Sequence, residues 1–158
     1  MNWWAAKAWV GYLNSTRYLG QNTWSLPTAD LTCGGGSGGY NCTNGQLGAL
    51  FYNSLGGVAL QSITTTHNAG YSLFTSIQSG VYWYGTEYGG YPYNAWVFGT
   101  NNGGQGGGNK GRGDYFYTWA MLPGNVSTIA AVPEPGEWVM MLAGFGLIGA
   151  IVRRRKQI

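Results

Sequence analysis

An uncharged stretch near the end of the chain restricts its fold more than any other feature. Residues 138–152 form a run of 15 residues without a charged side chain, and it is followed by Arg153, Arg154, Arg155 and Lys156. A helix of 15 residues spans roughly 22 Å, which is less than the ~30 Å hydrocarbon core of a bilayer, although long basic side chains can reach the interface. A core helix with a solvated basic end is the alternative. Apolar residues on all sides favour a single C-terminal transmembrane helix whose basic end, the membrane stop, stays cytoplasmic.

A proline-rich tripeptide precedes this stretch. Pro133, Glu134 and Pro135 are expected to be extended, because each proline fixes its own φ and disfavours helix in the residue before it. The order Pro-Glu-Pro, apolar helix and basic cluster resembles the PEP-CTERM sorting signal of Gram-negative bacteria. The resemblance implies that an exosortase recognises the tripeptide and cleaves near it. The protein would be held transiently in the inner membrane and then reach the cell surface or extracellular matrix.

This resemblance divides the chain into three parts. Residues 133–158 are the sorting signal, 127–132 a spacer and 1–126 the exported domain. Residues 1–7 show neither a basic n-region nor an uninterrupted apolar h-region of an export signal. Either the start codon lies upstream and the chain is truncated, or the copy is defective and stays inside the cell. We expect truncation, because the domain pattern begins almost at Met1.

Charged residues are scarce throughout. Only 8 Lys and Arg and 5 Asp and Glu occur in 158 residues, or 8%, against about 25% in a typical soluble domain. Before the tail the cations are Lys7, Arg17, Lys110 and Arg112. A duplex reader needs several cations on one face to displace counterions, so we expect no nucleic-acid partner.

Two segments have the apolar spacing i, i+3, i+4, i+7 that predicts an amphipathic helix. In residues 3–14 it is formed by Ala6, Trp9, Val10 and Leu13, which leaves Lys7 and Asn14 pointing outward. Nearly the same spacing recurs in Leu47, Leu50, Phe51 and Leu55, with Gly56 and Gly57 as the stop. Thr28 is placed to cap a short turn that includes Asp30.

The second half of the domain predicts strands. Short aromatic or β-branched stretches occur at 81–84, 95–98 and 115–121 and indicate an antiparallel sheet. Residues 99–113 are rich in glycine, so we expect them to form a long mobile loop between two strands. Helices followed by strands favour the α+β class.

Several short motifs along residues 1–126 occur in a characteristic order. They are residues 3–9, 24–28, 41–43, 50–57, 82–87, 95–98 and 122–126. This order resembles the Lcl C-terminal-type domain of bacterial exported proteins and adhesins. The resemblance implies a compact α+β domain related to C-type lectins and the formylglycine-generating enzyme, with two helices, a small antiparallel sheet and long glycine-rich loops. Ser25 and Leu122 stand where that family has arginine, and Asn125 where it has aspartate, which weakens any transfer of binding activity.

The two cysteines lie close in sequence. Cys33 and Cys42 enclose eight residues, five of them glycine, and such a loop can close within the ~4.4–6.8 Å between Cα atoms that a disulfide requires. The oxidising periplasm favours this pairing. Free thiols, or copper ligation by analogy with the formylglycine-generating enzyme, are the alternatives.

Few side chains suit catalysis. The titratable groups of the domain include His67, Asp30, Glu87 and Asp114, with no serine- or cysteine-based nucleophile motif and too few ligands for zinc. We interpret His67 as a loop residue and Glu87 as a structural hydrogen-bond hub or a ligand contact. We therefore expect neither an enzyme nor a cofactor.

Aromatic residues are the remaining functional signal. Tyr84, Tyr88, Tyr91 and Trp96, together with Glu87, are candidate ligand-binding residues, because exposed rings can stack on sugars. The alternative is that the sheet buries them as its core. Because neighbouring strand residues face opposite ways, one side of the 81–84 strand can be core and the other free.

These observations rank three functions. The first is a non-enzymatic exported surface or matrix protein that contacts extracellular polysaccharide. The second is a carbohydrate-binding, lectin-like adhesin. The third is an oxidoreductase related to the formylglycine-generating enzyme.

Overall fold

The computed structural model describes residues 1–111 and 113–122. They belong to the first of two units, Met1–Pro123, whereas the second is Gly124–Ile158. The predicted spacer, Pro-Glu-Pro motif, helix 138–152 and basic cluster thus lie outside the described residues. In the part that is described, no helix combines the length and the apolar character needed to span a bilayer.

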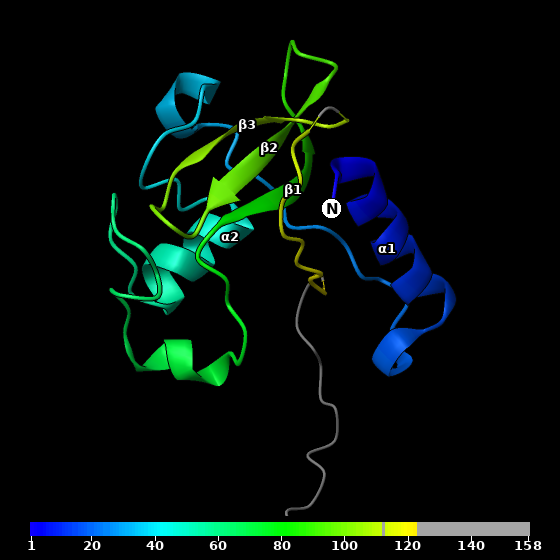
Figure 1. The fold of residues 1–158 in the computed structure, drawn as a ribbon, viewed down its shortest axis with the longest axis horizontal. Coiled ribbons are helices and arrows are strands. Elements are labelled where there is room, and N and C mark those ends of the chain that lie inside the picture. Colours follow the sequence, from blue (N-terminus) through cyan, green and yellow to red (C-terminus); the bar gives the residue numbers. More distant parts are fainter. Residues whose placement is uncertain (112, 123–158) are drawn as a thin grey trace, which may run out of the picture. The chain divides into compact units, whose positions relative to one another are not determined.

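The first helix, α1 (Trp3–Ser15), confirms the predicted helix 3–14 (Figure 1). It begins where the Asn2 side chain accepts the N–H of Ala5 at 2.9 Å, which satisfies one of the free donors of the first turn. Its buried face is formed by Trp3, Ala6, Val10 and Leu13.

Two details of α1 differ from prediction. Trp9 is 36% exposed and Trp3 is buried in its place, because the Trp3 indole N–H donates to the Tyr84 carbonyl at 2.8 Å. Asn14 does not point freely outward: its amide donates to the Trp24 carbonyl and its oxygen accepts the Trp24 N–H. Long-range bonds therefore decide which face of the helix is covered.

The second helix combines α2 (Gln46–Gly48) with the π-helical segment η3 (Ala49–Ser54). Leu47, Phe51 and Leu55 are buried, as the spacing predicts. Gly56 follows with φ +70°, and this left-handed conformation ends the helix as predicted. The described residues also contain three short 3₁₀ turns, η1 (Tyr18–Gly20), η2 (Cys33–Gly36) and η4 (Ala69–Leu73).

A three-stranded antiparallel sheet confirms the α+β class. Its strands are β1 (Val81–Glu87), β2 (Asn94–Gly99) and β3 (Gln105–Asn109), in the order β1-β2-β3 (Figure 1). The first two strands were predicted. The third is not the 115–121 segment, which contributes only the isolated bridges Tyr82–Tyr117 and Ser25–Met121.

The strand β3 corrects the prediction of a mobile loop at 99–113. It pairs with β2 along its length, from Asn94 opposite Asn109 to Phe98 opposite Gln105. Glycine fits here because neighbouring side chains pack directly on the backbone. A Cβ at Gly108 would lie 2.9 Å from Phe116 and 2.9 Å from Val97.

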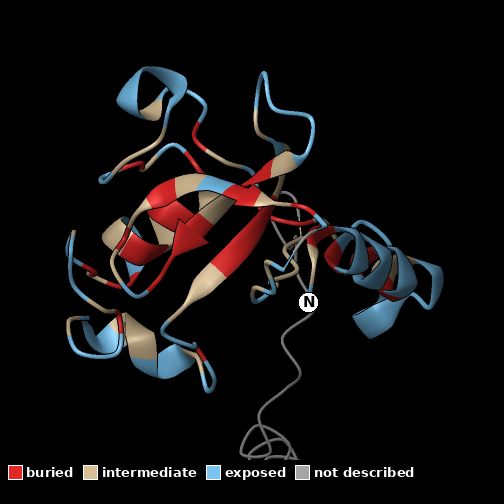
Figure 2. Ribbon diagram, turned by 45° about the horizontal axis from the view of Figure 1, so that its top comes forward, coloured by how far each residue is buried: buried red, intermediate tan, exposed pale blue. Residues whose placement is uncertain are grey.

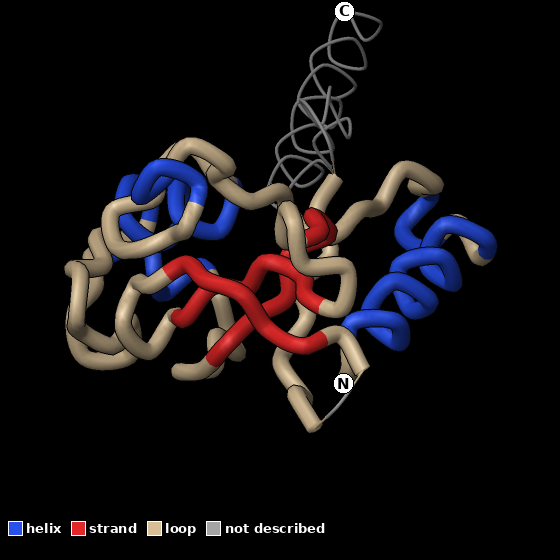
Figure 3. Tube along the Cα trace, turned by 90° about the horizontal axis from the view of Figure 1, so that it is seen from above, coloured by secondary structure: helices blue, strands red, loops and turns tan. Residues whose placement is uncertain are grey.

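Helical segments cover both faces of the sheet (Figures 2 and 3). The α2–η3 side packs on one set of strand residues, Tyr82, Tyr84, Trp96 and Phe98. The α1 side packs on the alternate set, Trp83 and Ala95. Tyr82, Trp83 and Tyr84 are all buried, so the prediction of one free side of β1 is wrong.

Candidate functional site

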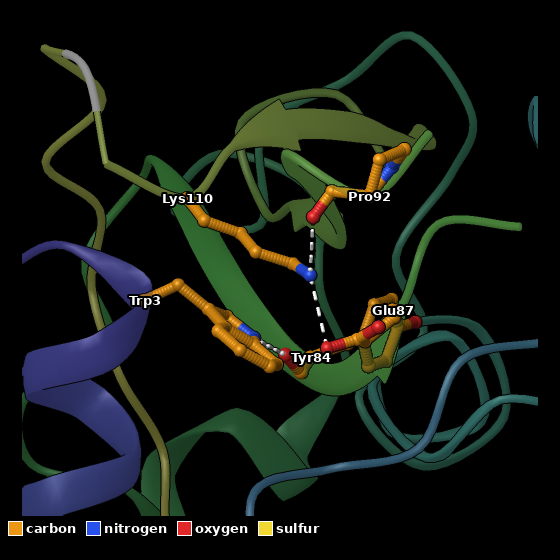
Figure 4. A network of polar contacts seen from close by, with 5 residues as sticks. All are labelled: Trp3, Tyr84, Glu87, Pro92 and Lys110. Atoms are coloured by element: carbon orange, nitrogen blue, oxygen red, sulfur yellow. Dashed lines mark hydrogen bonds and ion pairs between the residues drawn. The ribbon is translucent and has the colours of Figure 1, made fainter. Parts of the chain in front are cut away.

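A buried cation lies where three segments of the domain meet. Lys110 directly follows β3 and is only 3% exposed. Its Nζ lies 2.9 Å from the Glu87 Oε1 and donates to the Pro92 carbonyl at 2.9 Å (Figure 4). The same nitrogen lies 4.7 Å from the ring centre of Trp3 and 5.6 Å from that of Trp4. We call Lys110, Glu87, Pro92 and Trp3 the Lys110 cluster.

The backbone of Lys110 joins the same segments. Its N–H donates to the Tyr93 carbonyl at 2.8 Å, and its carbonyl accepts the N–H of Trp3 at 3.3 Å. A buried charge is costly unless it is paired, and here a carboxylate, a carbonyl and aromatic rings share that role. Lys110 therefore fixes the start of α1 and the β1–β2 connection against the end of β3.

A pocket of about 520 Å³ opens beside this cluster. Its lining residues come from α1, the β1–β2 connection and the end of β3: Trp4, Pro92, Tyr93, Asn109, Lys110 and Gly111. Trp4 is 57% exposed and Tyr93 is 78% exposed, so two aromatic rings remain accessible. We call it the Trp4 pocket. Its size lies within the ~300–1,000 Å³ that is usual for small-molecule sites.

The predicted ligand-binding residues do not share one exposed face. Tyr84 and Trp96 are buried in the core, and burial raises the pKa of the Tyr84 phenol. Tyr88 packs against Trp96 with their ring centres 4.3 Å apart, whereas Tyr91 is largely exposed. Glu87 pairs with Lys110. That Tyr84, Glu87, Tyr88, Tyr91 and Trp96 bind a ligand stays a prediction.

A second buried charge lies at the other end of β3. Asp30 is 4% exposed and accepts the Thr32 hydroxyl at 2.7 Å and the backbone N–H groups of Thr32, Cys33 and Asn44. The Thr32 hydroxyl and these N–H groups lower the pKa of Asp30, and burial opposes them. The backbone N–H of Asp30 also donates to the Gln105 side-chain oxygen, and the backbone carbonyl of Asp30 accepts a hydrogen bond from the Gln105 side-chain amide. We call these residues the Asp30 cluster; Asp30, and not Thr28 as predicted, organises this turn.

The predicted disulfide closes the loop beside Asp30. Cys33 and Cys42 are joined with their Cα atoms 5.3 Å apart, which confirms the pairing. Both sulfurs are thereby occupied, so the alternatives of free thiols and copper ligation are wrong for this form of the protein. His67 is exposed and stacks on Tyr71, with ring centres 4.1 Å apart. Within residues 1–111 and 113–122, no three His, Cys, Asp or Glu side chains group as a metal site.

Sequence reasoning did not single out Lys110 or Trp4 as site residues. The available signal was the scarcity of charge: a lysine inside a glycine-rich segment of such a chain is a candidate for an internal ion pair with one of the few carboxylates. Its partners could not be read from spacing, because they lie at distant positions in the chain.

Comparison with known proteins identifies one segment. The family model described as the PEP-CTERM protein-sorting motif matches residues 131–156, which include Pro133, Glu134 and Pro135 and the four consecutive cations. Neither a curated protein nor a solved structure matches the chain. PEP-CTERM signals mark proteins that are exported to the cell surface via exosortase. The chain therefore carries a PEP-CTERM sorting motif and is an exosortase-targeted, exported surface protein.

Proposed function

We propose that exosortase cleaves the chain near Pro133–Glu134–Pro135 and that residues 1–126 act afterwards as a non-enzymatic surface or matrix protein of a Gram-negative bacterium. The sorting motif at 131–156 is the observation on which this proposal depends. The motif begins eight residues after Pro123, where the first of the two units ends. Before cleavage, the apolar run 138–152 holds the protein in the inner membrane.

The state of the reactive groups supports a structural or binding role. Asp30 is occupied by four hydrogen bonds, Glu87 and Lys110 pair with each other, and Cys33 and Cys42 form a disulfide. These interactions stabilise the fold, which is consistent with a structural or binding role. An oxidoreductase that needs free thiols would require this disulfide to open.

Changing the tripeptide tests the proposal. The chain is expressed behind an export signal in a bacterium that has an exosortase, as wild type, Glu134→Ala and Glu137→Ala. Glu137 is the matched control because it is a neighbouring carboxylate outside the tripeptide. We expect wild type and Glu137→Ala at the cell surface with a mass that shows loss of the tail. Glu134→Ala should stay uncut in the membrane fraction.

Two results would contradict the proposal. One is uncut wild-type protein in the cytosol, and the other is equal cleavage of all three proteins. The second candidate function, a carbohydrate-binding lectin-like adhesin, is favoured by the exposed rings of Trp4, Tyr91 and Tyr93.

A further inference from the structure

We propose that the Trp4 pocket binds a neutral saccharide, with a sugar ring stacked on the indole of Trp4 and bordered by the ring of Tyr93. This inference rests on the proposed function, because it requires the domain to lie at the cell surface. It also places the binding site away from Tyr84 and Trp96, which are buried.

The orientation of two adjacent tryptophans is the first argument. Trp3 is fully buried, whereas Trp4, the next residue of α1, is 57% exposed. Their rings meet edge to face with centres 4.8 Å apart, and the Lys110 Nζ lies 5.6 Å from the Trp4 ring. The Trp4 ring is thus positioned by buried neighbours before any ligand arrives. A ring that is already fixed loses little side-chain entropy on binding.

The composition of the walls is the second argument. Trp4, Pro92 and Tyr93 supply apolar ring surface, while the exposed Tyr93 hydroxyl can donate and accept hydrogen bonds. A saccharide presents the matching combination, since its C–H face is apolar and its rim carries hydroxyls. Pockets of this type use mostly aromatic surface with a few polar groups.

Charge is the third argument and selects a neutral sugar. Among the described residues that line the pocket, Lys110 carries the one cation, and its ammonium is bonded to the Glu87 carboxylate and to the Pro92 carbonyl. An anionic sugar would have to compete with Glu87 for that ammonium and would lie near its carboxylate. The pair therefore favours an uncharged ring over a uronate.

Affinity electrophoresis in native gels tests the inference with the full chain in a polyoxyethylene detergent, which carries no sugar of its own. The gels contain dextran, agarose or polygalacturonate. We expect at least one neutral polymer to retard the protein. Stronger retardation by polygalacturonate than by both neutral polymers would overturn the choice of a neutral ligand.

Matched variants locate the binding site. Trp4→Ala and Tyr93→Ala remove the two exposed rings, and Tyr12→Ala and Tyr115→Ala remove rings that are 63% and 73% exposed and do not line the pocket. We expect the first two to weaken binding about tenfold, as loss of an aromatic stacking contact of ~1.4 kcal/mol implies, and the controls to leave it unchanged. Circular dichroism checks that all four variants are folded. Equal binding by all four would overturn the inference.

The result separates this inference from the proposed function. Protein that is cut and displayed at the surface, yet retarded by no polymer, would remove the saccharide site and leave the surface role intact. Self-association that Trp4→Ala abolishes, without retardation by any polymer, would show a second copy as the occupant and would likewise overturn the inference.

Discussion

The two ends of β3 each adjoin a buried charge, and the protein accommodates the two charges in opposite ways. Asp30, bonded to Gln105 at the start of the strand, is surrounded by neutral donors, most of them within three residues in sequence. Lys110, after the end of the strand, is paired with a carboxylate and a carbonyl from the β1–β2 hairpin. The anion thus organises a local loop, whereas the cation joins distant segments.

This difference predicts different sensitivities. The Asp30 cluster has part-buried backbone donors that are fixed by the loop, and they would lose their common acceptor together if the carboxylate is removed. In the Lys110 cluster the partner carboxylate is 62% exposed, so water can take over when the ammonium is removed. We therefore expect the anionic cluster to contribute more to stability than the cationic one.

Asp30→Ala should have the largest effect. It leaves three backbone N–H groups and the Thr32 hydroxyl without their acceptor, and we expect a loss of about 3–4 kcal/mol in unfolding free energy. Asp30→Asn keeps one oxygen and should lose less, about 1–2 kcal/mol. Urea unfolding of the full chain in mild detergent measures both. Near-wild-type stability of Asp30→Ala would remove the contrast between the clusters.

Removal of the disulfide should cause the second-largest loss of unfolding free energy. Opening a closed loop of about ten residues is expected to cost roughly 2–3 kcal/mol, chiefly by freeing the unfolded chain. The double variant Cys33→Ser/Cys42→Ser and reduced wild type should show the same urea midpoint. The double variant also serves as the control for the reductant, because it has no disulfide and its urea midpoint should not change when the reductant is added. A wild-type midpoint that does not move on reduction would contradict the prediction.

Lys110→Met should rank third, with a loss of about 1–2 kcal/mol in unfolding free energy. The loss is limited because methionine keeps much of the apolar contact of the lysine side chain and avoids the cost of burying a charge. Lys7→Met is the matched control, since Lys7 also lies 4.7 Å from the Trp3 ring but is exposed. It should change stability by less than about 0.5 kcal/mol. A larger loss for Lys110→Met than for Asp30→Ala would reverse the proposed order.

The dependence of stability on acid should be the smallest effect. The pKa of Asp30 is lowered in the folded protein, so its contribution is present above the unfolded value of 3.8 and is lost as pH falls through the folded value. Unfolding free energies at about pH 6 and about pH 3 measure this loss. Asp30→Asn should lose less over the same interval. An equal decline in both proteins would assign the acid sensitivity to other carboxylates.

The sequence predicted the elements that depend on neighbouring residues. The first helix, the stop after Leu55, two strands and the Cys33–Cys42 pairing all follow from local spacing, and the sorting motif is itself a linear pattern. The strand β3 was missed because glycine offers no apolar periodicity from which a strand can be recognised. Its pairing depends on β2 and on rings such as Phe116 that pack on its backbone.

The site was less accessible to sequence reasoning. The burial of Lys110 depends on its contacts with Glu87, Pro92 and Trp3, and no local sequence pattern connects these residues with Lys110. The predicted aromatic set was chosen by density in sequence, and that density reflects the sheet core as well as the surface. The relation to C-type lectins stays a prediction.

The isolated bridges beside the sheet affect how the protein meets neighbouring molecules at the cell surface. Tyr117 pairs with Tyr82 along the outer side of β1, and Gly39 pairs with Gln105 at the start of β3. An open strand edge can recruit a strand from another molecule and start aggregation. A single bridge on each flank occupies part of both edges. Both edges therefore offer fewer free backbone groups to a strand from a neighbouring molecule, which lowers the tendency to form intermolecular β-structure.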